Sequence, residues 1–339
     1  MGLALDLARS GYSAPNPHVG CVIVAAENVV GQGGSEAPGG AHAEIVALRE
    51  AGAQARGADV YVTLEPCNHQ GRTGPCSHAL VAAGARRVYV GCPDPHPDAQ
   101  GGADYLRSHG VEVVVGVREA ECRHQHRAFL FAATHDLAYV TAKIAETADG
   151  FSAREDGTSK WITNEDARAD GHRIRAEMGA VLVGRGTIEH DDPLLTSRIA
   201  GVTAQPQRYV LDPYRRLASH YRVFVGSDPA RRVVALEHAQ PGDLAVPWAE
   251  DGLDLLAVVR ELRAEGHIGV LVEGGSNTVS HFIERGLADE VVIYRASDVE
   301  FGSGLPSLSE RARKALNTYQ SGIPQTFGTT TRLSFFRQA

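Results

Sequence analysis

The chain has 339 residues, which exceeds the size at which one hydrophobic core normally keeps growing, so we expect two domains of ordinary size. Hydrophobic residues make up 43% and charged residues 22%, which is typical of a soluble globular protein and argues against a disordered chain. The net charge of -8 argues against binding to nucleic-acid backbones, because that binding depends on clustered Lys and Arg.

The sequence contains no stretch that is long and apolar enough to span a bilayer, and residues 1–9 show neither a basic leader nor a cleavage site. We therefore expect a cytoplasmic protein that acts on a small molecule, with neither membrane nor nucleic acid as a partner. An odd number of cysteines without an export signal indicates metal or catalytic use and not disulfides. These cysteines are Cys21, Cys67, Cys76, Cys92 and Cys122.

The first part of the chain alternates apolar strands with helical patterns. Helices are expected at residues 3–10, 42–50, 76–83 and 103–109, and strands at residues 21–24, 60–64, 87–91 and 112–116. Regular alternation of this kind predicts a central sheet covered by helices. Residues 119–135 are expected to form a helix that leads out of this unit.

A second alternating series begins with an expected strand at residues 139–145. It continues with helices at 166–178, 253–265 and 278–285, and with strands at 180–184, 209–211, 222–225, 233–236, 268–273 and 290–294. Residues 240–250 are expected to be a surface loop. The sequence thus predicts two α/β domains, at residues 1–130 and 138–339.

Potential metal ligands stand near the starts of two expected helices. His42 opens one helix, Cys76 opens another directly after a proline, and Cys67 follows a strand. One imidazole and two thiolates supply three zinc ligands and leave the fourth tetrahedral position for a water, as a catalytic site requires. Glu44 is then free to move a proton from that water to departing ammonia. His-x-Glu followed by Pro-Cys is the known signature of nucleobase deaminases, here with a longer gap between the cysteines.

Two other interpretations of these residues are a structural zinc site with His69 as fourth ligand and a set of reduced cysteines without metal. Neither gives Glu44 a role, so a catalytic zinc is favoured. His69 and Arg72 suit a substrate that bears a phosphate, although an ordinary solvated charge explains Arg72 equally well.

Several longer runs carry a family resemblance. They are residues 15–20, 42–44 and 63–76 in the first half, and residues 143–150, 160–163, 183–198 and 272–275 in the second. Together they closely resemble the bifunctional pyrimidine deaminase and reductase of riboflavin biosynthesis. The resemblance covers nearly the whole chain and implies a cytidine-deaminase-like three-layer α/β domain followed by a dihydrofolate-reductase-like α/β domain.

The resemblance implies two reactions. A zinc-dependent deamination replaces an amino group by an oxo group on a diaminopyrimidinone that carries a phosphoribosylamino group. A reduction with NADPH then converts the ribosyl group to ribityl. We also expect a homo-oligomer, either a dimer or a tetramer. The rival interpretations are a zinc deaminase of nucleosides or RNA with a C-terminal recognition domain, which the acidic balance disfavours, and a zinc-stabilised binding protein.

The resemblance also assigns roles to individual residues. Asn16 is expected to line the base pocket. Lys143 is a candidate from its chemistry and not from the resemblance: if held in a strand beneath the substrate, it could orient or protonate the sugar oxygen. Contacts to the reductase substrate are expected from Ser159, Arg175, Leu195, Arg198 and Glu273. Contacts to the nucleotide are expected from Trp161, Thr187, Asp191, Gly275, Ser276 and Thr278.

Physical arguments agree with part of this assignment. Glycines 274 and 275 and the helix that follows place free N–H groups where a pyrophosphate could sit, although an ordinary strand-to-helix turn is an equal explanation. Arg175 and Arg198 offer forked donors to a phosphate, although a solvated helix residue is an equal explanation of Arg175. Trp161 is a nicotinamide wall or a core residue, and the residue taken by itself favours the core. Selection of NADPH over NADH requires a cation near the 2′-phosphate, with Arg185, Arg215 and Arg216 as candidates.

Four features depart from the family pattern. Glu146 replaces a small residue near the nucleotide, Pro213 replaces a hydrogen-bonding residue, and His18 replaces an asparagine or small apolar residue. The run at residues 295–302 lacks the expected apolar pattern. Three of these four features lie in the second half. We therefore expect departures from the family in reductase efficiency, cofactor choice and the C-terminal interface more than in the deaminase.

Overall fold

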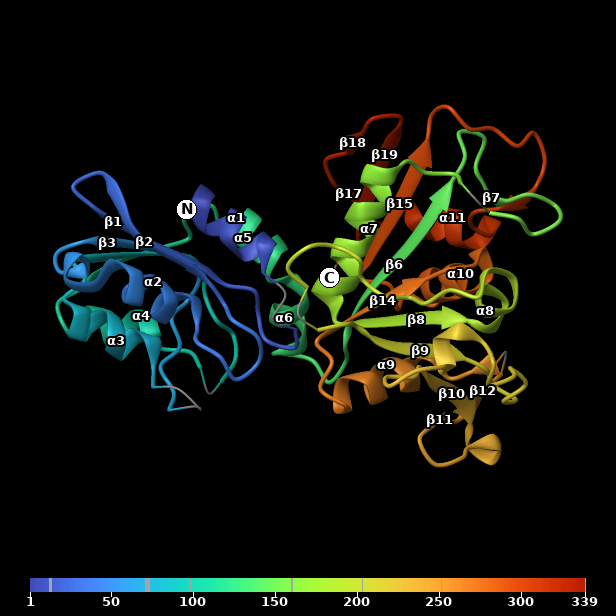
Figure 1. The fold of residues 1–339 in the computed structure, drawn as a ribbon, viewed down its shortest axis with the longest axis horizontal. Helices are drawn as coiled ribbons and strands as arrows, with labels where there is room; N and C mark the ends of the chain where they lie inside the picture. The colour runs from blue at the N-terminus through green and yellow to red at the C-terminus, as the bar shows by residue number, and fades with distance from the viewer. Residues whose placement is uncertain are drawn as a thin grey trace. The chain divides into compact units, whose positions relative to one another are not determined.

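The structure is a computed structural model that describes residues 1–11, 14–70, 74–97, 99–159, 161–202, 204–250 and 252–338 (Figure 1). It divides into two compact units, Met1–His135 with Gly201–Ala204 and Asp136–Ala200 with Gln205–Ala339. The expected functional domains, residues 1–130 and 138–339, stay predictions. Within the described ranges, none of the helices has the length and apolar character needed to cross a membrane.

The first unit is built on a sheet with the strand order β2-β1-β3-β4-β5. The strands are β1 (Gly20–Ala25), β2 (Asn28–Gly34), β3 (Asp59–Leu64), β4 (Arg87–Cys92) and β5 (Glu112–Val115). β1 runs antiparallel to β2 and β3, whereas β3, β4 and β5 are parallel. The parallel ends of β3 and β4 therefore point to the same edge, where the loop carrying Cys67 begins.

Helices cover both faces of this sheet. They are α1 (Gly2–Ser10), α2 (Ala43–Ala51), α3 (Cys76–Ala83), α4 (Gly102–Ser108), α5 (Glu119–Gln125) and α6 (Arg127–Ala132), with a short 3-10 helix η1 (Gly52–Ala55). Figure 1 shows α1 and α5 on one face and α2, α3 and α4 on the other. A Cβ on Gly31 would lie 2.2 Å from the carbonyl oxygen of Ala47, so glycine is what lets α2 pack against β2. This three-layer arrangement confirms the fold expected for the first domain.

The second unit has a larger sheet with the order β11-β10-β9-β8-β14-β6-β15-β19-β17, and β18 pairs with β19. The strands of its parallel part are β6 (Tyr139–Glu146), β8 (Ala180–Gly184), β9 (Gln207–Leu211), β10 (Arg231–Ala235), β11 (Leu244–Val246), β14 (Gly269–Glu273) and β15 (Glu290–Ala296). The antiparallel edge consists of β17 (Gln320–Ser321), β18 (Gln325–Phe327) and β19 (Thr330–Phe336). Two small ladders join β7 (Phe151–Ala153) to β16 (Leu305–Pro306), and β12 (Trp248–Ala249) to β13 (Gly252–Leu253).

Helices also lie on both faces of the second sheet. They are α7 (Glu165–Met178), α8 (Arg185–Asp191), α9 (Leu255–Ala264), α10 (Ser276–Glu284) and α11 (Glu310–Leu316), with 3-10 helices η2 (Arg222–Phe224) and η3 (Leu236–His238). Buried side chains of α9, α10 and α11 share one core with Ala142 and Ile144 of β6. Side chains alternate along a strand, so Lys143 and Ala145 point to the opposite face, toward α7. The carboxyl ends of β6, β8 and β14 share one edge, and this edge positions the second site.

The structure corrects several expected elements. Residues 222–225 form a 3-10 turn and not a strand, because Val223 is fully buried while Val225 is 60% exposed and no partner strand is present among the described residues. The expected loop at 240–250 contains β11 and β12. Residues 119–135 form two short helices that meet at His126, whose buried ring reaches Thr63 of β3 with Nε2 to Oγ1 at 3.0 Å.

Candidate functional site

The three expected zinc ligands converge in the first unit. His42 is the N-cap residue of α2, Cys76 is the first residue of α3, and Cys67 lies in the loop after β3. Nδ1 of His42 lies 3.5 Å from Sγ of Cys67 and 3.3 Å from Sγ of Cys76. A tetrahedral zinc with bonds of about 2.0–2.3 Å needs ligand atoms roughly 3.5 Å apart, so this donor set fits zinc.

The surroundings of Cys67 favour its thiolate. Hydrogen bonds from the Cys76 thiol and from the His42 ring outweigh burial and lower the pKa of the Cys67 thiol to about 4. The backbone N–H of Cys76 also donates to Sγ of Cys67 at 3.4 Å. Zinc binds the thiolate form of cysteine, so Cys67 is the ligand that these surroundings favour. The same hydrogen bond to Cys67, followed by burial, raises the pKa of the Cys76 thiol above its usual range.

Glu44 lies in the first turn of α2 and is only 3% exposed. Burial, followed by the charge of the Cys67 thiolate, raises the pKa of its carboxyl to about 7. Among the described residues, the group able to hold a metal comprises His42, Cys67 and Cys76 and does not include His69. The geometry therefore gives no support to a structural site with His69 as fourth ligand. Glu44 lies beside the three ligands, with a side-chain hydrogen bond to Cys76.

The remaining residues expected at this site are spread over two loops. His69 is partly buried in the loop between the cysteines, and its Nδ1 is buried without a hydrogen-bond partner in the described structure. Asn16 is exposed in the loop that leads to β1, and Arg72 lies outside the described residues. His18 is buried, which lowers the pKa of its imidazole to about 4 and keeps it neutral.

Two residues that the sequence analysis did not identify support the cysteine loop. The Glu65 carboxylate accepts hydrogen bonds from the N–H groups of Asp94 at 3.2 Å and Ala103 at 2.9 Å, which ties the loop after β3 to the loop after β4 and to α4. The Asn68 side chain accepts a bond of 2.8 Å from the Ser77 hydroxyl on α3. The sequence could have indicated Glu65, because it places a carboxylate directly after a buried strand.

A cavity of about 200 Å³ lies in the second unit, on the α7 side of the sheet. Its lining comes from β6, α7, the end of β14 and two loops, and consists of Lys143, Ala145, Ser159, Trp161, Ile162, Thr163, Arg168, Gly171, His172, Arg175, Arg198 and Glu273. Most of the residues expected to contact the reductase substrate are in this set. Leu195 is not; it is buried and has a positive φ of 55°.

Glu273 organises the charges of this cavity. Its carboxylate accepts from Nζ of Lys143 at 3.1 Å and from Nε of Arg175 at 2.7 Å. Burial alone would raise the pKa of this carboxyl, but Arg175 and Lys143 outweigh burial and hold it well below its usual range. His172 is kept neutral because burial, Arg175 and Arg198 lower the pKa of its imidazole to about 4. The cavity walls thus carry more positive than negative charge, which suits a phosphorylated substrate.

Two glycine turns interlock beside the cavity, at the ends of β8 and β14. The hydroxyl of Thr187 on α8 accepts from the N–H of Gly275 at 3.0 Å. A Cβ on Gly274, which has a φ of +127°, would lie 2.5 Å from that hydroxyl oxygen, and one on Gly184 would lie 2.3 Å from Oγ1 of Thr278. The first turn of α10 has no side-chain cap. Its N–H groups and positive helix end fit a pyrophosphate.

The other residues expected at the nucleotide lie on nearby segments. Asp191 is the last residue of α8 and is partly exposed. Trp161 is 72% exposed, with the guanidinium of Arg168 4.6 Å from its ring centroid. This exposure excludes the alternative that Trp161 is a core residue.

The three candidate cations for a 2′-phosphate differ in their partners. Arg185 lies 3.6 Å from Glu189, and Arg215 donates to Asp243 at 2.9 Å. The guanidinium of Arg216 stacks on Tyr214, with its carbon 4.5 Å from the ring centroid, and forms no ion pair with a carboxylate among the described residues; the backbone N–H of Arg216 donates to Asp212 at 2.8 Å. Tyr214 in turn lies 5.1 Å from Trp248, ring centroid to ring centroid.

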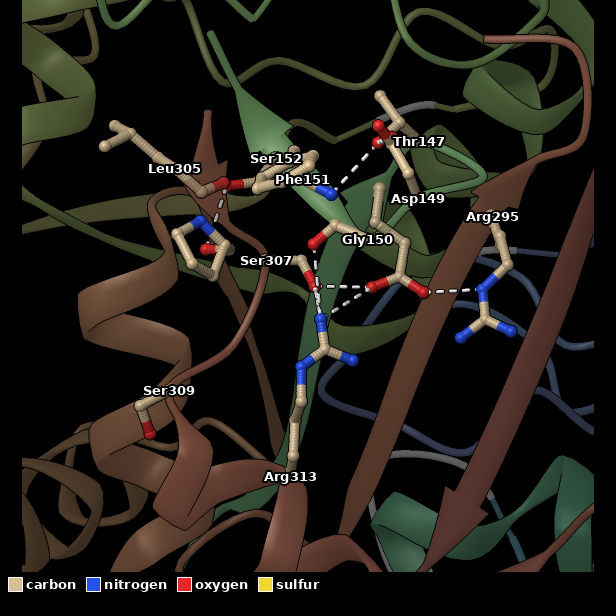
Figure 2. Close-up of polar contacts among 12 residues, drawn as sticks. Thr147, Asp149, Gly150, Phe151, Ser152, Arg295, Leu305, Ser307, Ser309 and Arg313 are labelled. Atoms are coloured by element: carbon tan, nitrogen blue, oxygen red, sulfur yellow. Dashed lines mark hydrogen bonds and ion pairs between the residues drawn. The ribbon is translucent and has the colours of Figure 1, made fainter. Parts of the chain in front are cut away.

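Glu146, one of the departures from the family pattern, is fully buried and paired. Its carboxylate accepts from Nε of Arg295 at 2.6 Å, from a terminal nitrogen of Arg313 at 3.4 Å, and from the Ser307 hydroxyl. These donors come from β15, from α11 and from the segment between them (Figure 2). Arg295 belongs to the atypical run at 295–302, so two of the departures are parts of one network.

The same segment packs along the turn after β6. Ala148 N–H donates to the carbonyl of Val299 at 2.8 Å, and the Asp149 carboxylate accepts from Gly302 N–H at 2.7 Å. Glu146 is the last residue of β6, so this network lies at the start of the turn to β7, after which the chain continues to the cavity residues Ser159 and Trp161.

Comparisons with known proteins agree with this two-part arrangement. The sequence-family model of the RibD C-terminal domain matches residues 138–310. The sequence-family model of the cytidine and deoxycytidylate deaminase zinc-binding region matches residues 1–92. The riboflavin biosynthesis protein RibD of Aquifex aeolicus is 39% identical over 316 residues, which cover 90% of this chain and 88% of that protein.

Two solved structures are similar over the whole chain. Acinetobacter baumannii RibD has a TM-score of 0.85 and 34% identity, with 100% of this chain and 98% of that chain covered. The diaminohydroxyphosphoribosylaminopyrimidine deaminase/5-amino-6-(5-phosphoribosylamino)uracil reductase of Thermotoga maritima has a TM-score of 0.84 and 32% identity, with 100% and 97% covered. The chain therefore belongs to the RibD family of riboflavin biosynthesis enzymes, in which a zinc-dependent deaminase domain is joined to an NADPH-dependent reductase domain.

Proposed function

We propose that the chain deaminates a diamino-phosphoribosylaminopyrimidinone at the centre of His42, Cys67 and Cys76, and reduces the ribosyl group of the product at the cavity of Lys143 and Glu273. The observation that carries this proposal is the presence of a separate, chemically complete set of groups in each unit. A nearly buried carboxylate stands beside three zinc ligands in one. A cationic cavity stands beside two interlocked glycine turns in the other.

In the deaminase, Nδ1 of His42 and the two cysteine sulfurs would hold the zinc. Zinc supplies the Lewis acidity that makes water a nucleophile near neutral pH. Glu44 accepts a proton from the attacking water and returns it to the leaving amine, so that ammonia departs and the oxygen of water becomes the oxo group. A carboxyl whose pKa is raised by burial is suited to both steps. Asn16, His69 and Arg72 are proposed to bind the base and the phosphate.

In the reductase, bound NADPH would supply the hydride that reduces C1′ of the ribosyl group. The bond between C1′ and the ring oxygen breaks, and Lys143 donates a proton to that oxygen. Glu273 orients Lys143 through its contact with Nζ at 3.1 Å. Arg175 and Arg198 are proposed to bind the substrate phosphate, with Ser159 and Leu195 beside it.

The nucleotide is proposed to run along the shared edge of β14, β8 and β9. Gly275, Ser276 and Thr278 at the start of α10 would hold the pyrophosphate, and Thr187 and Asp191 of α8 would lie beside it. Trp161 would cover the nicotinamide.

Arg216 is the cation best suited to a 2′-phosphate. β8 and β9 are paired, with Gly184 opposite Leu211, so the segment at 213–216 leaves the sheet beside the start of α8. Tyr214 would then offer a ring face to the adenine.

The test is incubation with the diaminopyrimidine substrate, with and without NADPH, followed by mass analysis. Without NADPH we expect replacement of one amino group by an oxo group and release of ammonia. With NADPH we expect a further gain of two hydrogens. Failure to consume NADPH when the deaminated compound is supplied would contradict the reductase assignment. A homo-oligomeric state and a cytoplasmic location stay predictions.

A further inference from the structure

A buried tyrosine lies beneath the reductase cavity. Tyr294 on β15 is 1% exposed, and Nζ of Lys143 lies over its ring, 5.6 Å from the centroid. This distance is within the range in which a cation is attracted to an aromatic face. The sequence analysis noted Tyr294 only as the end of a strand.

The hydroxyl of Tyr294 connects the sheet to the helix that walls the cavity. It donates to the carboxylate of Asp170 on α7 at 2.6 Å. Burial, followed by the charge of Asp170, raises the pKa of this hydroxyl above its usual range, so it stays a proton donor. Asp170 immediately precedes Gly171 and His172, which line the cavity.

Asp170 is itself held from the neighbouring strand. Arg332 of β19 lies 3.2 Å from the Asp170 carboxylate and 3.3 Å from that of the fully buried Glu290. The Tyr294 hydroxyl thus donates to an acceptor that is itself ion-paired, in an interior setting where hydrogen bonds to charged groups are strong. The hydrogen bond to Asp170 therefore fixes the position of the Tyr294 ring.

A lysine has a long flexible stem, and one ion pair leaves its ammonium free to swing. Lys143 meets the Glu273 carboxylate on one side and the Tyr294 ring on another. A ring held in place by Asp170 therefore restricts the ammonium to the part of the cavity that it shares with Glu273. Alignment of a proton donor with its acceptor contributes directly to rate.

We propose that Tyr294 is a positioning residue of the reductase, which orients Lys143 with its ring and is itself held by Asp170. The inference rests on the proposed role of Lys143 as the group that protonates the sugar oxygen. The aromatic face is the essential part, and the hydroxyl serves to hold that face in place.

The chain offers a matched control in Tyr209 on β9. It is also 1% exposed, and its hydroxyl also donates to a carboxylate at 2.6 Å, that of Glu265. Neither tyrosine is part of the cavity lining, and the cation over the Tyr209 ring is Arg231, at 5.9 Å from the centroid, in place of Lys143. Loss of Tyr209 therefore reproduces the packing and hydrogen-bonding loss without the contact to Lys143.

The experiment measures NADPH oxidation with the deaminated substrate for Tyr294→Leu, Tyr294→Phe and Tyr209→Leu, with thermal unfolding recorded for each. We expect Tyr294→Leu to lower kcat by about 5- to 30-fold, as loss of a desolvated cation–π contact implies, with little change in KM for NADPH. Tyr294→Phe is expected to recover kcat to within about 3-fold of the wild type, because the ring remains. Tyr209→Leu is expected to lower the unfolding temperature but not kcat.

A double variant tests whether Tyr294 acts through Lys143. In a Lys143→Met background, Tyr294→Leu should cause little further loss of kcat, because the group that it positions is absent. The inference is overturned if Tyr294→Leu keeps the wild-type kcat, if Tyr294→Phe loses as much as Tyr294→Leu, or if Tyr209→Leu loses as much. It is also overturned if the two losses multiply in the double variant. Absence of NADPH oxidation in the wild-type enzyme would instead overturn the proposed function.

Discussion

The deaminase centre and the reductase cavity are assembled in different ways. His42 and Cys76 stand at the starts of two helices and Cys67 in the loop between them, so the centre depends on a few short segments. The reductase cavity takes Lys143 from β6, Arg175 from α7 and Glu273 from β14. In the first case two helix starts and one loop set the side-chain positions, and in the second the order and register of strands does.

The strongest way to separate the two sites is to remove a metal ligand. Cys76→Ser is expected to lose zinc and with it nearly all deamination, since three protein ligands are the usual minimum for a catalytic zinc. Reduction of the deaminated substrate should continue. Zinc content and ammonia release are the measurements, with Cys122→Ser, a buried cysteine outside the centre, as the control. Full zinc occupancy with undiminished deamination would refute the ligand assignment.

Glu44→Gln tests proton transfer without removing the metal. A positioned acid–base group contributes about 100- to 10,000-fold, so deamination should fall by that order while zinc stays bound. Glu50→Gln, an exposed position on the same helix, should change little. The variant should still oxidise NADPH with the deaminated substrate. If reduction were lost as well in a folded protein, the two sites would not be independent.

Arg198→Ala is the reverse experiment. A hydrogen bond between charged groups is worth about 1.5–3 kcal/mol, which corresponds to a loss of about 10- to 100-fold in kcat/KM for the reductase. Deamination should be unchanged. Arg260→Ala, on the surface of α9, serves as the control for loss of a cation. An equal loss of kcat/KM in both variants would show that Arg198 does not bind the substrate.

The smallest expected effect concerns the cofactor. Arg216→Ala should raise KM for NADPH by about tenfold and leave KM for NADH unchanged, because one charge-assisted contact to the 2′-phosphate is lost. Arg185→Ala, whose guanidinium already faces Glu189, should have little effect. Steady-state kinetics with both nucleotides provide the measurement. A wild-type enzyme with equal kcat/KM for NADPH and NADH would contradict the preference itself.

The two sites also differ in how far the sequence could predict them. His42, Glu44, Cys67 and Cys76 were identified from their chemistry, and the structure brings the three ligand atoms together as expected. The helix at residues 76–83 was predicted with its observed bounds, because a proline precedes it and a glycine follows. β2 was missed because three glycines interrupt its pattern, and two of them, Gly31 and Gly33, are what allow α2 to approach.

Apart from Lys143, the residues of the reductase site could be predicted only through the family resemblance. Glu273 meets Lys143 because the two are register partners in the pairing of β14 with β6, and no local pattern sets that register. The bond from Tyr294 to Asp170 likewise depends on how α7 packs on β15. The exposure of Trp161 is a tertiary property that composition around it does not predict.

The network around Glu146 bears on how segments can be exchanged between family members. A small residue at this position, taken alone, would leave Arg295 and Arg313 side by side without their shared carboxylate. Loss of Arg295 alone would leave a fully buried carboxylate with one weaker ion pair. Removing one partner of a buried pair is far more costly than replacing both together. A chimera that takes residues 143–150 from a relative with a small residue at position 146 therefore needs the end of β15 and the start of α11 from that same relative.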